Sequence, residues 1–242
     1  MAVGSAIEWT EATWNPTTGC SKISSGCANC YAETLAKRLH VMGIPKYDSG
    51  FTYTEHKSAV DIPLTWKKSR RIFVNSMSDL FHEDATTEFI ARCFDVMTKA
   101  NWHTYQILTK RPHRMRDFSH MFEKYFGVLI PNYIWMGTSV ENADTLYRLD
   151  DLRKVRCKIK FISFEPLLGP VGQVNLSGIH WVIIGGESGP GYRPVKKEWI
   201  IDIISQCQQQ HAPVFFKQWG GPRPKSGGRH INGRIYNEYP KI

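Results

Sequence analysis

Short apolar segments alternate with longer amphipathic segments along most of the chain. Runs rich in β-branched and aromatic residues predict seven strands, within residues 7–14, 71–75, 103–108, 133–137, 159–164, 180–185 and 213–217. Between them, apolar residues recur at helical spacing and predict helices at 31–42, 85–100, 112–126, 145–155 and 197–210. Residues 51–54 are compatible with a further short strand. This alternation indicates a parallel sheet covered by helices.

The number and order of these segments favour a complete or partial βα barrel of α/β class. An open doubly wound sheet is the alternative with the same alternation. We expect residues 1–220 to form one barrel domain, because no stretch within them has the composition of a linker. Residues 221–242 are a tail rich in Gly, Pro and basic residues, in which Asn232-Gly233 predicts a hairpin between 229–231 and 234–236.

Polar side chains follow nearly every predicted strand. In a parallel sheet or barrel the carboxyl ends of the strands lie together and form the binding site. Helix capping is an alternative explanation for the Ser, Thr, Asn and Asp residues. It does not explain carboxylates and lysines that end apolar strands, so we expect one convergent site. The candidates are Ser76, Ser78, Asp79, Thr109, Lys110, Ser139, Glu141, Asn142, Glu165, Gly186, Glu187 and Lys217.

The composition narrows the cellular setting and the class of partner. The 242 residues contain no apolar run long enough to span a bilayer, and the first residues lack a secretory signal, so we expect a cytoplasmic protein without a membrane partner. The net charge of +9, from 31 Lys and Arg against 22 Asp and Glu, favours nucleic acid or a nucleotide as partner. A solvated basic surface is the alternative.

Three of the six cysteines lie close together at C-x6-C-x2-C spacing, as Cys20, Cys27 and Cys30, directly after the first predicted strand. In a reducing compartment such a cluster indicates metal or redox chemistry rather than disulfides. Three ligands without an obvious fourth suggest a metal centre with one open position, since structural zinc sites and ferredoxin-type clusters normally have four. Zinc with a His or a distant Cys as fourth ligand is the alternative. The remaining cysteines, 93, 157 and 207, lie in apolar patterns and are expected to be buried.

A three-cysteine loop after the first strand of a βα barrel resembles the radical SAM superfamily. Within it, the chain resembles a small three-cysteine family of phages and bacteria that is related to spore photoproduct lyase. The closer match covers nearly the whole chain. It lies in residues 7–10, 13–16, 19–20, 27–32, 72–83, 108–112, 165–170, 185–190 and 215–220.

The resemblance implies a 4Fe-4S cluster held by Cys20, Cys27 and Cys30. Its fourth iron would bind S-adenosylmethionine (SAM), which is cleaved to a 5′-deoxyadenosyl radical. Glu165, Glu187 and Lys217, singled out by their places at the strand ends, are the further catalytic candidates. Residues that would bind SAM or position the substrate are Tyr31, Ser76, Ser78, Asp79, Thr109, Lys110, Ser139, Glu141, Asn142 and Gly186.

Two features depart from the superfamily pattern. Its common cysteine spacing is C-x3-C-x2-C, whereas six residues separate Cys20 from Cys27 here. Its Gly-Gly-Glu motif, which receives the SAM amino group, usually follows the second strand. Here that place holds residues 76–79, and Gly185-Gly186-Glu187 comes later, so Ser78 and Asp79 are the positional candidates.

The resemblance and the basic composition together suggest a nucleic-acid base as substrate. A thymine derivative in DNA is favoured, for example in phage DNA hypermodification, with RNA or a free nucleotide as alternatives. The reaction would be an isomerisation, lysis or repair, with a flavodoxin or ferredoxin as electron donor, in the host cytoplasm if the protein is phage-encoded. The competing hypothesis is a non-catalytic protein, stabilised by zinc or a cluster, that binds nucleic acid or another partner.

Overall fold

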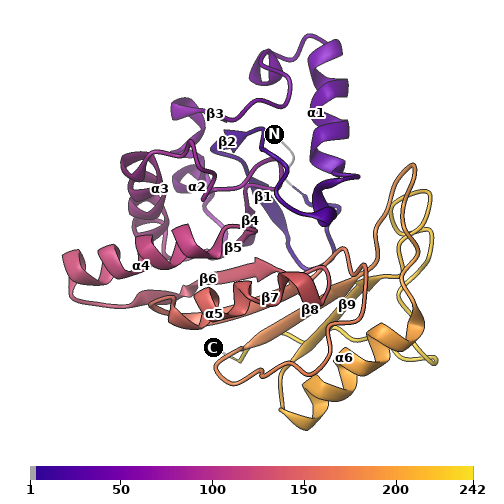
Figure 1. Cartoon of the computed structure of the whole chain (residues 1–242). Helices are drawn as coiled ribbons and strands as arrows, with labels where there is room; N and C mark the ends of the chain where they lie inside the picture. The colour runs from indigo at the N-terminus through magenta and orange to yellow at the C-terminus, as the bar shows by residue number, and fades with distance from the viewer. Residues whose placement is uncertain (1–3, 242) are drawn as a thin grey trace.

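A computed structural model describes residues 4–241. Its main element is a sheet of seven strands in the order β1-β4-β5-β6-β7-β8-β9, and every neighbouring pair is parallel. The sheet is strongly curved, and β1 and β9 lie at its two open edges, so it forms a half-barrel (Figure 1). The strands are β1 Ala12–Trp14, β4 Arg71–Val74, β5 Thr104–Thr109, β6 Ile130–Ser139, β7 Cys157–Phe164, β8 Trp181–Gly185 and β9 Val214–Gln218.

Helices connect most of these strands, as the alternating pattern predicts. The α-helices are α1 Tyr31–Val41, α2 Ile62–Thr65, α3 Thr87–Lys99, α4 Pro112–Phe126, α5 Arg148–Lys154 and α6 Lys197–Gln209. Short 3-10 turns lie at η1 Ser25–Cys27, η2 Pro45–Tyr47, η3 Lys57–Ala59 and η4 Ala143–Thr145. Two short strands, β2 Thr17–Thr18 and β3 Thr54–Glu55, pair antiparallel outside the main sheet. None of the helices in the described part of the chain has the length and apolarity needed to cross a bilayer.

The two faces of the sheet carry different apolar cores. Because side chains alternate along a strand, residues two apart share a face. Ile72, Val74 and Ile107 belong to the larger core, which includes residues of α3, α4 and α6. Phe73, Trp135 and Trp181 belong to a separate, mostly aromatic core on the concave face. The concave face is therefore filled toward the amino ends of the strands, and polar side chains remain for the carboxyl ends.

The tail is paired with the open edge of the sheet beside β9. Residues 236–238 run antiparallel to β9, through backbone hydrogen bonds from Phe216 N to Tyr236 O and from Glu238 N to Val214 O. The hairpin predicted at Asn232-Gly233 is confirmed, since Ile231 and Arg234 exchange both backbone hydrogen bonds. Both turn residues have positive φ, of 50° and 78°, as a type I′ turn requires. The tail thus covers backbone groups that an edge strand would otherwise expose.

The structure confirms the partial form of the expected barrel, because no strand of the described residues joins β1 to β9. It corrects two other sequence-based expectations. The first strand covers only Ala12–Trp14 rather than 7–14, because Thr10 N bonds to Ile7 O in a turn that packs Trp9 against Phe73 on the concave face. The short strand expected at 51–54 lies at Thr54–Glu55.

Candidate functional site

The cysteine loop, residues 19–30, follows β2 and leads into α1. Its three thiols are free and half-buried, whereas Cys93, Cys157 and Cys207 are buried, as expected from their apolar patterns. The loop starts at Gly19, whose φ is +77° and where a Cβ atom would lie 2.1 Å from Thr52 O. Only glycine suits this position, because both the backbone conformation and the close approach exclude a side chain.

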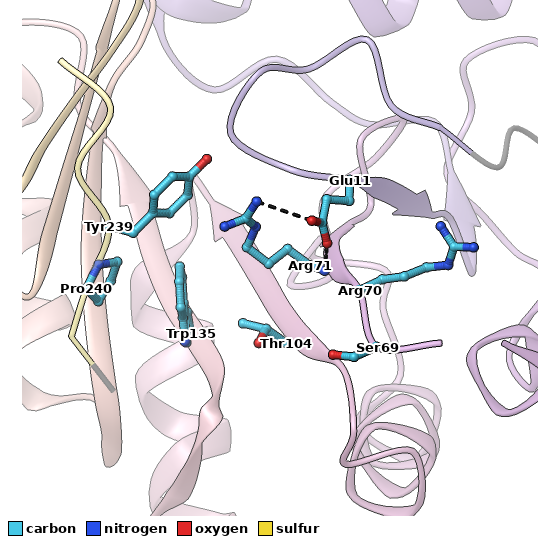
Figure 2. Close-up of a pocket in the computed structure, with 8 residues that line it drawn as sticks. All are labelled: Glu11, Ser69, Arg70, Arg71, Thr104, Trp135, Tyr239 and Pro240. Atoms are coloured by element: carbon cyan, nitrogen blue, oxygen red, sulfur yellow. Dashed lines mark hydrogen bonds and ion pairs between the residues drawn. The ribbon is translucent and has the colours of Figure 1, made fainter. Parts of the chain in front are cut away.

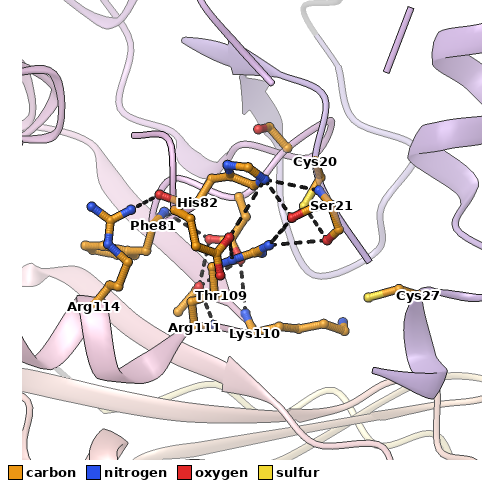
Figure 3. A network of polar contacts seen from close by, with 12 residues as sticks. Cys20, Ser21, Cys27, Phe81, His82, Thr109, Lys110, Arg111 and Arg114 are labelled. Atoms are coloured by element: carbon orange, nitrogen blue, oxygen red, sulfur yellow. Dashed lines mark hydrogen bonds and ion pairs between the residues drawn. The ribbon is translucent and has the colours of Figure 1, made fainter. Parts of the chain in front are cut away.

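The first anchor of the loop is Arg111, which lies between β5 and α4. Its Nη2 donates to Ser21 O at 3.2 Å and to Ser21 Oγ at 2.7 Å, and its Nη1 donates to Cys20 Sγ at 3.6 Å. The same guanidinium donates to Asp79 Oδ2 at 3.1 Å and to Glu83 Oε2 at 2.6 Å. Figure 3 shows this network around the buried guanidinium. Burial opposes its charge, but Asp79, Cys20 and Glu83 outweigh burial and raise the pKa of Arg111.

The Cys20 thiol lies between opposing influences. Burial and the negative charge of Asp79 raise its pKa to about 11, while Arg111 acts in the opposite direction. Ser21 is held from a second side, because its backbone N donates to His82 Nε2 at 3.1 Å. The Cys20 arm of the loop is therefore fixed by residues that follow β4 and β5.

The Asp79 carboxylate accepts several hydrogen bonds from within the protein. Its oxygens accept from Thr109 Oγ1 at 2.7 and 2.9 Å, from Phe81 N at 2.9 Å and from Lys110 N at 3.2 Å, besides Arg111. With these donors its side chain is occupied within the protein. Asp79 and Thr109 thus orient the Arg111 guanidinium, and their expected contact with a cofactor stays a prediction.

The second anchor is Glu141, which follows β6 and is fully buried. Its Oε1 accepts from Ser24 Oγ at 2.9 Å, and its Oε2 accepts from Arg148 Nη1 at 3.0 Å. Lys110 Nζ lies 3.5 Å from Oε1. Gly26 packs directly on this carboxylate, since a Cβ atom there would lie 2.5 Å from both Cγ and Oε1. The middle of the cysteine loop, including turn η1, therefore rests on Glu141.

The third anchor is Glu187, which follows β8. Asn29 Nδ2 donates to its Oε2 at 3.0 Å, and Arg193 Nε donates to the same oxygen at 2.9 Å. Arg193 also donates to Ser25 O at 3.0 Å. Burial alone would raise the pKa of Glu187, but the hydrogen bonds from Arg193 and Asn29 hold it below its usual range.

Residues after β4 hold the two ends of the loop. Ser78 Oγ donates to Gly19 O at 2.6 Å, and the two residues form an isolated parallel bridge. At the other end the Tyr31 hydroxyl donates to Ser76 O. Strand ends β4, β5, β6 and β8 thus all contact one loop.

A second group of polar residues lies on the concave face. Glu165, after β7, pairs with Lys217 of β9, and both are mostly buried. Ser139 of β6 and Ser163 of β7 are neighbours in register, and the buried Ser163 Oγ has no hydrogen-bond partner among the described residues. An unpartnered buried hydroxyl costs free energy unless a ligand or water satisfies it.

Two expected site residues also have structural roles, and their expected contacts with a cofactor stay predictions. Asn142 caps turn η4 in a capping box with Thr145, which is the helix-capping alternative allowed by the sequence. Gly186 gives room for Trp219, because a Cβ atom there would lie 2.0 Å from Trp219 O.

The thiols are the donor type that iron–sulfur clusters and zinc require. Within residues 4–241, no group of three or more His, Cys, Asp and Glu side chains is placed to hold a metal ion. The chemistry of the three thiols, together with cationic donors such as Arg111 and Lys110 beside the loop, fits an anionic metal cluster.

The comparisons place this whole arrangement in one family. A family model described as a protein of unknown function, DUF5131, matches residues 4–240. The chain belongs to the DUF5131 family. Neither curated proteins nor solved structures gave a match. The DUF5131 match spans the half-barrel, the cysteine loop and the tail, so these parts belong to a single family unit.

Sequence reasoning missed several residues of this DUF5131 site. Arg111 directly follows the Thr109-Lys110 pair, so its place at a strand end was a usable signal. Ser24 and Asn29 lie between the cysteines, which was a second signal. Arg148 and Arg193 lie seven and six residues after Glu141 and Glu187, so their nearness in the sequence to these carboxylates was a third signal.

The basic run at residues 67–71 lies away from the cysteine loop. Arg71 and Thr104 begin β4 and β5, so this run is at the amino ends of the strands. A cavity of about 290 Å³ opens there, and Figure 2 shows Arg71 between Glu11 and Tyr239. The carbon of the Arg71 guanidinium lies 4.4 Å from the centre of the Tyr239 ring, and its Nη2 lies 3.3 Å from Glu11 Oε1. This cavity is distinct from the candidate site.

Proposed function

We propose that this protein is a radical SAM enzyme that modifies, isomerises or repairs a nucleic-acid base. The observation that carries the proposal is the convergence of four strand ends on one loop with three free thiols. A helix cap or a solvated surface would not require three buried side chains, Arg111, Glu141 and Glu187, to contact the same loop.

Cys20, Cys27 and Cys30 would hold a 4Fe-4S cluster. When bound, such a cluster supplies the electron that cleaves SAM into methionine and a 5′-deoxyadenosyl radical. The polypeptide supplies the surroundings. Glu141 and Glu187 hold the loop through Ser24 and Asn29, and α1 presents the partial positive charge of its N-terminus directly after Cys30.

The concave face suits a polar ligand, because polar side chains at the carboxyl ends of the strands lie next to the aromatic core of that face. Glu165 and Lys217 offer one carboxylate and one ammonium group, which match the amino and carboxylate groups of SAM or an aminoacyl group on the substrate. The unpartnered Ser163 hydroxyl supports a ligand at this level. Below it, the aromatic core of the concave face excludes water, which a reactive radical requires.

The proposed substrate is a base in DNA, with a thymine derivative favoured, and RNA or a free nucleotide as alternatives. The net charge of +9 favours a polyanion. A base within a duplex would have to be flipped out of the stack to reach the concave face. A flavodoxin or ferredoxin would supply the electron.

Anaerobic reconstitution with iron and sulfide tests the proposal. We expect about four iron and four sulfide per chain, as a 4Fe-4S cluster requires, and 5′-deoxyadenosine from SAM after reduction. Assays with modified and unmodified DNA then identify the substrate. Tight zinc binding, with no SAM cleavage under the same conditions, would refute the enzyme and favour a zinc-stabilised binding protein.

A further inference from the structure

Two arginines near the strand ends are similar in burial and differ in whether they contact a cysteine. The side chains of Arg111 and Arg148 are each 1% exposed, and each donates to a buried carboxylate, Asp79 and Glu141 respectively. Arg148 donates its other hydrogen bond to Ser139 O. Arg111 instead reaches the first cysteine, with Nη1 3.6 Å from Cys20 Sγ.

The orientation of Arg111 is fixed independently of that sulfur. Asp79 and Glu83 hold the guanidinium from one side, and Ser21 O and Oγ hold it from the other. Asp79 is itself fixed by Thr109. The donor therefore points at the Cys20 sulfur without needing the sulfur to orient it.

We infer that Arg111 is a positioning residue that fixes the Cys20 arm and donates a charge-assisted hydrogen bond to its sulfur. This inference rests on the proposed function. Hydrogen bonds to cluster sulfurs stabilise the more negative, reduced state, and are a principal way in which a protein tunes the reduction potential. Arg111 thus makes the cluster easier to reduce, and Arg148 does not.

A lysine at either position provides the matched test. Arg111→Lys keeps the positive charge and a contact with Asp79, but a single ammonium group cannot reach Ser21, Glu83 and Cys20 as the planar fork does. Arg148→Lys makes the same chemical change beside Glu141 without touching a sulfur. Arg111→Gln also removes the charge, and the lysine variant keeps the test valid if this one does not fold.

The experiment is an anaerobic redox titration of the reconstituted proteins, followed by electron paramagnetic resonance, with iron counted in each sample. We expect Arg111→Lys to bind as much iron as the wild type. Its reduction equilibrium should be about tenfold less favourable, which for one electron is a reduction potential about 59 mV more negative. Arg148→Lys should keep the wild-type potential.

The outcomes separate the two hypotheses. If the wild type assembles no cluster, the proposed function fails and this inference fails with it. If the wild type assembles one and Arg111→Lys has the same potential, only the role of Arg111 is refuted. Iron loss in Arg111→Lys with an unchanged potential in the remaining cluster would also refute it, because the role would then be structural alone.

Discussion

The Oγ of Ser24 donates a 2.9 Å hydrogen bond to Oε1 of Glu141, which lies 117 residues further along the chain. This contact joins the middle of the cysteine loop to the carboxyl end of β6. Glu141 also compensates the buried charge of Arg148. The same carboxylate therefore holds the cysteine loop in place and stabilises the half-barrel.

Glu141→Gln should destabilise the protein by about 3 kcal/mol, because it leaves the buried Arg148 without a counter-charge. Urea unfolding of the metal-free protein measures this loss. Asp150→Asn is the control, since the Asp150 carboxylate is 71% exposed and should contribute less than about 1 kcal/mol. A loss at Glu141 as small as that of the control would contradict the assigned role.

Gly26→Ala should cost about 2 kcal/mol, because the new methyl group would meet the side chain of Glu141 at 2.5 Å. It should also lower the iron bound on reconstitution. The clash needs both partners, so Gly26→Ala combined with Glu141→Ala should cost less than the sum of the single changes. Additive losses in this double-mutant cycle would show that the two residues are not coupled.

Cys27→Ala should abolish metal binding and leave the fold intact. Cys27 is half-buried in the loop, so its loss should change the unfolding free energy of the metal-free protein by less than about 0.5 kcal/mol. Cys93→Ala is the matched control, because Cys93 lies in the core and should keep wild-type iron content. Iron content and circular dichroism test both, and global unfolding of Cys27→Ala would indicate a structural metal instead.

Stability should fall in mild acid through His103. Burial lowers its pKa, the hydrogen bond to Pro63 O opposes this, and the charge of Arg70 adds to it. The folded-state pKa is therefore below the unfolded value of about 6.5, and the unfolded chain binds more protons in this range. The stabilisation is complete above about pH 6.5 and is lost as the pH falls through the lower, folded-state pKa.

His103→Gln keeps a donor for Pro63 O and removes the titration. Between pH 8 and pH 5 it should lose about 1 kcal/mol less unfolding free energy than the wild type. His113→Gln, at an exposed position, should behave as the wild type does. Identical pH profiles for all three proteins in urea unfolding would exclude His103 as a contributor.

Arg223→Gln should weaken DNA binding and reduce its salt slope by about one, as expected for the loss of one phosphate contact. Arg223 is exposed and has no acidic partner among the described residues. Arg153→Gln is the control, because Arg153 is already paired with Asp150 at 3.0 Å. Binding of Arg223→Gln that equals the wild type at every salt concentration would place the DNA contact outside the tail.

Deleting residues 221–242 would be a poorer test of DNA binding. Residues 236–238 cover the edge of β9, and Trp181 Nε1 donates to Glu238 O at 2.7 Å. A truncated protein would lose these contacts, so weaker binding could not be separated from damage to the barrel.

Local pattern alone located the seven strands of the main sheet, five of the α-helices in the described residues and the hairpin, because each depends on residues close in sequence. Phe215 and Lys217, for example, must share a face of β9, since side chains alternate along a strand. Polar residues that directly follow apolar strands must likewise lie at the carboxyl end of a parallel sheet, whatever the strand order. The three thiols and the buried nature of Cys93 followed from spacing and apolar context.

The contacts within the site were decided by the tertiary structure. Ser24 and Glu141 are 117 residues apart and Asn29 and Glu187 are 158 residues apart, and only the fold of the sheet brings each pair together. The position of Asp79 after a strand favours a ligand-binding carboxylate, but the fold surrounds it with Thr109 and Arg111. The sequence around a hydrogen-bond donor does not reveal which distant residue will accept the bond. Many different intervening sequences would allow the same two side chains to come together. Closure of the barrel would require β1 and β9 to pair with each other. The strand pattern does not determine this, because the two strands lie at opposite ends of the sequence.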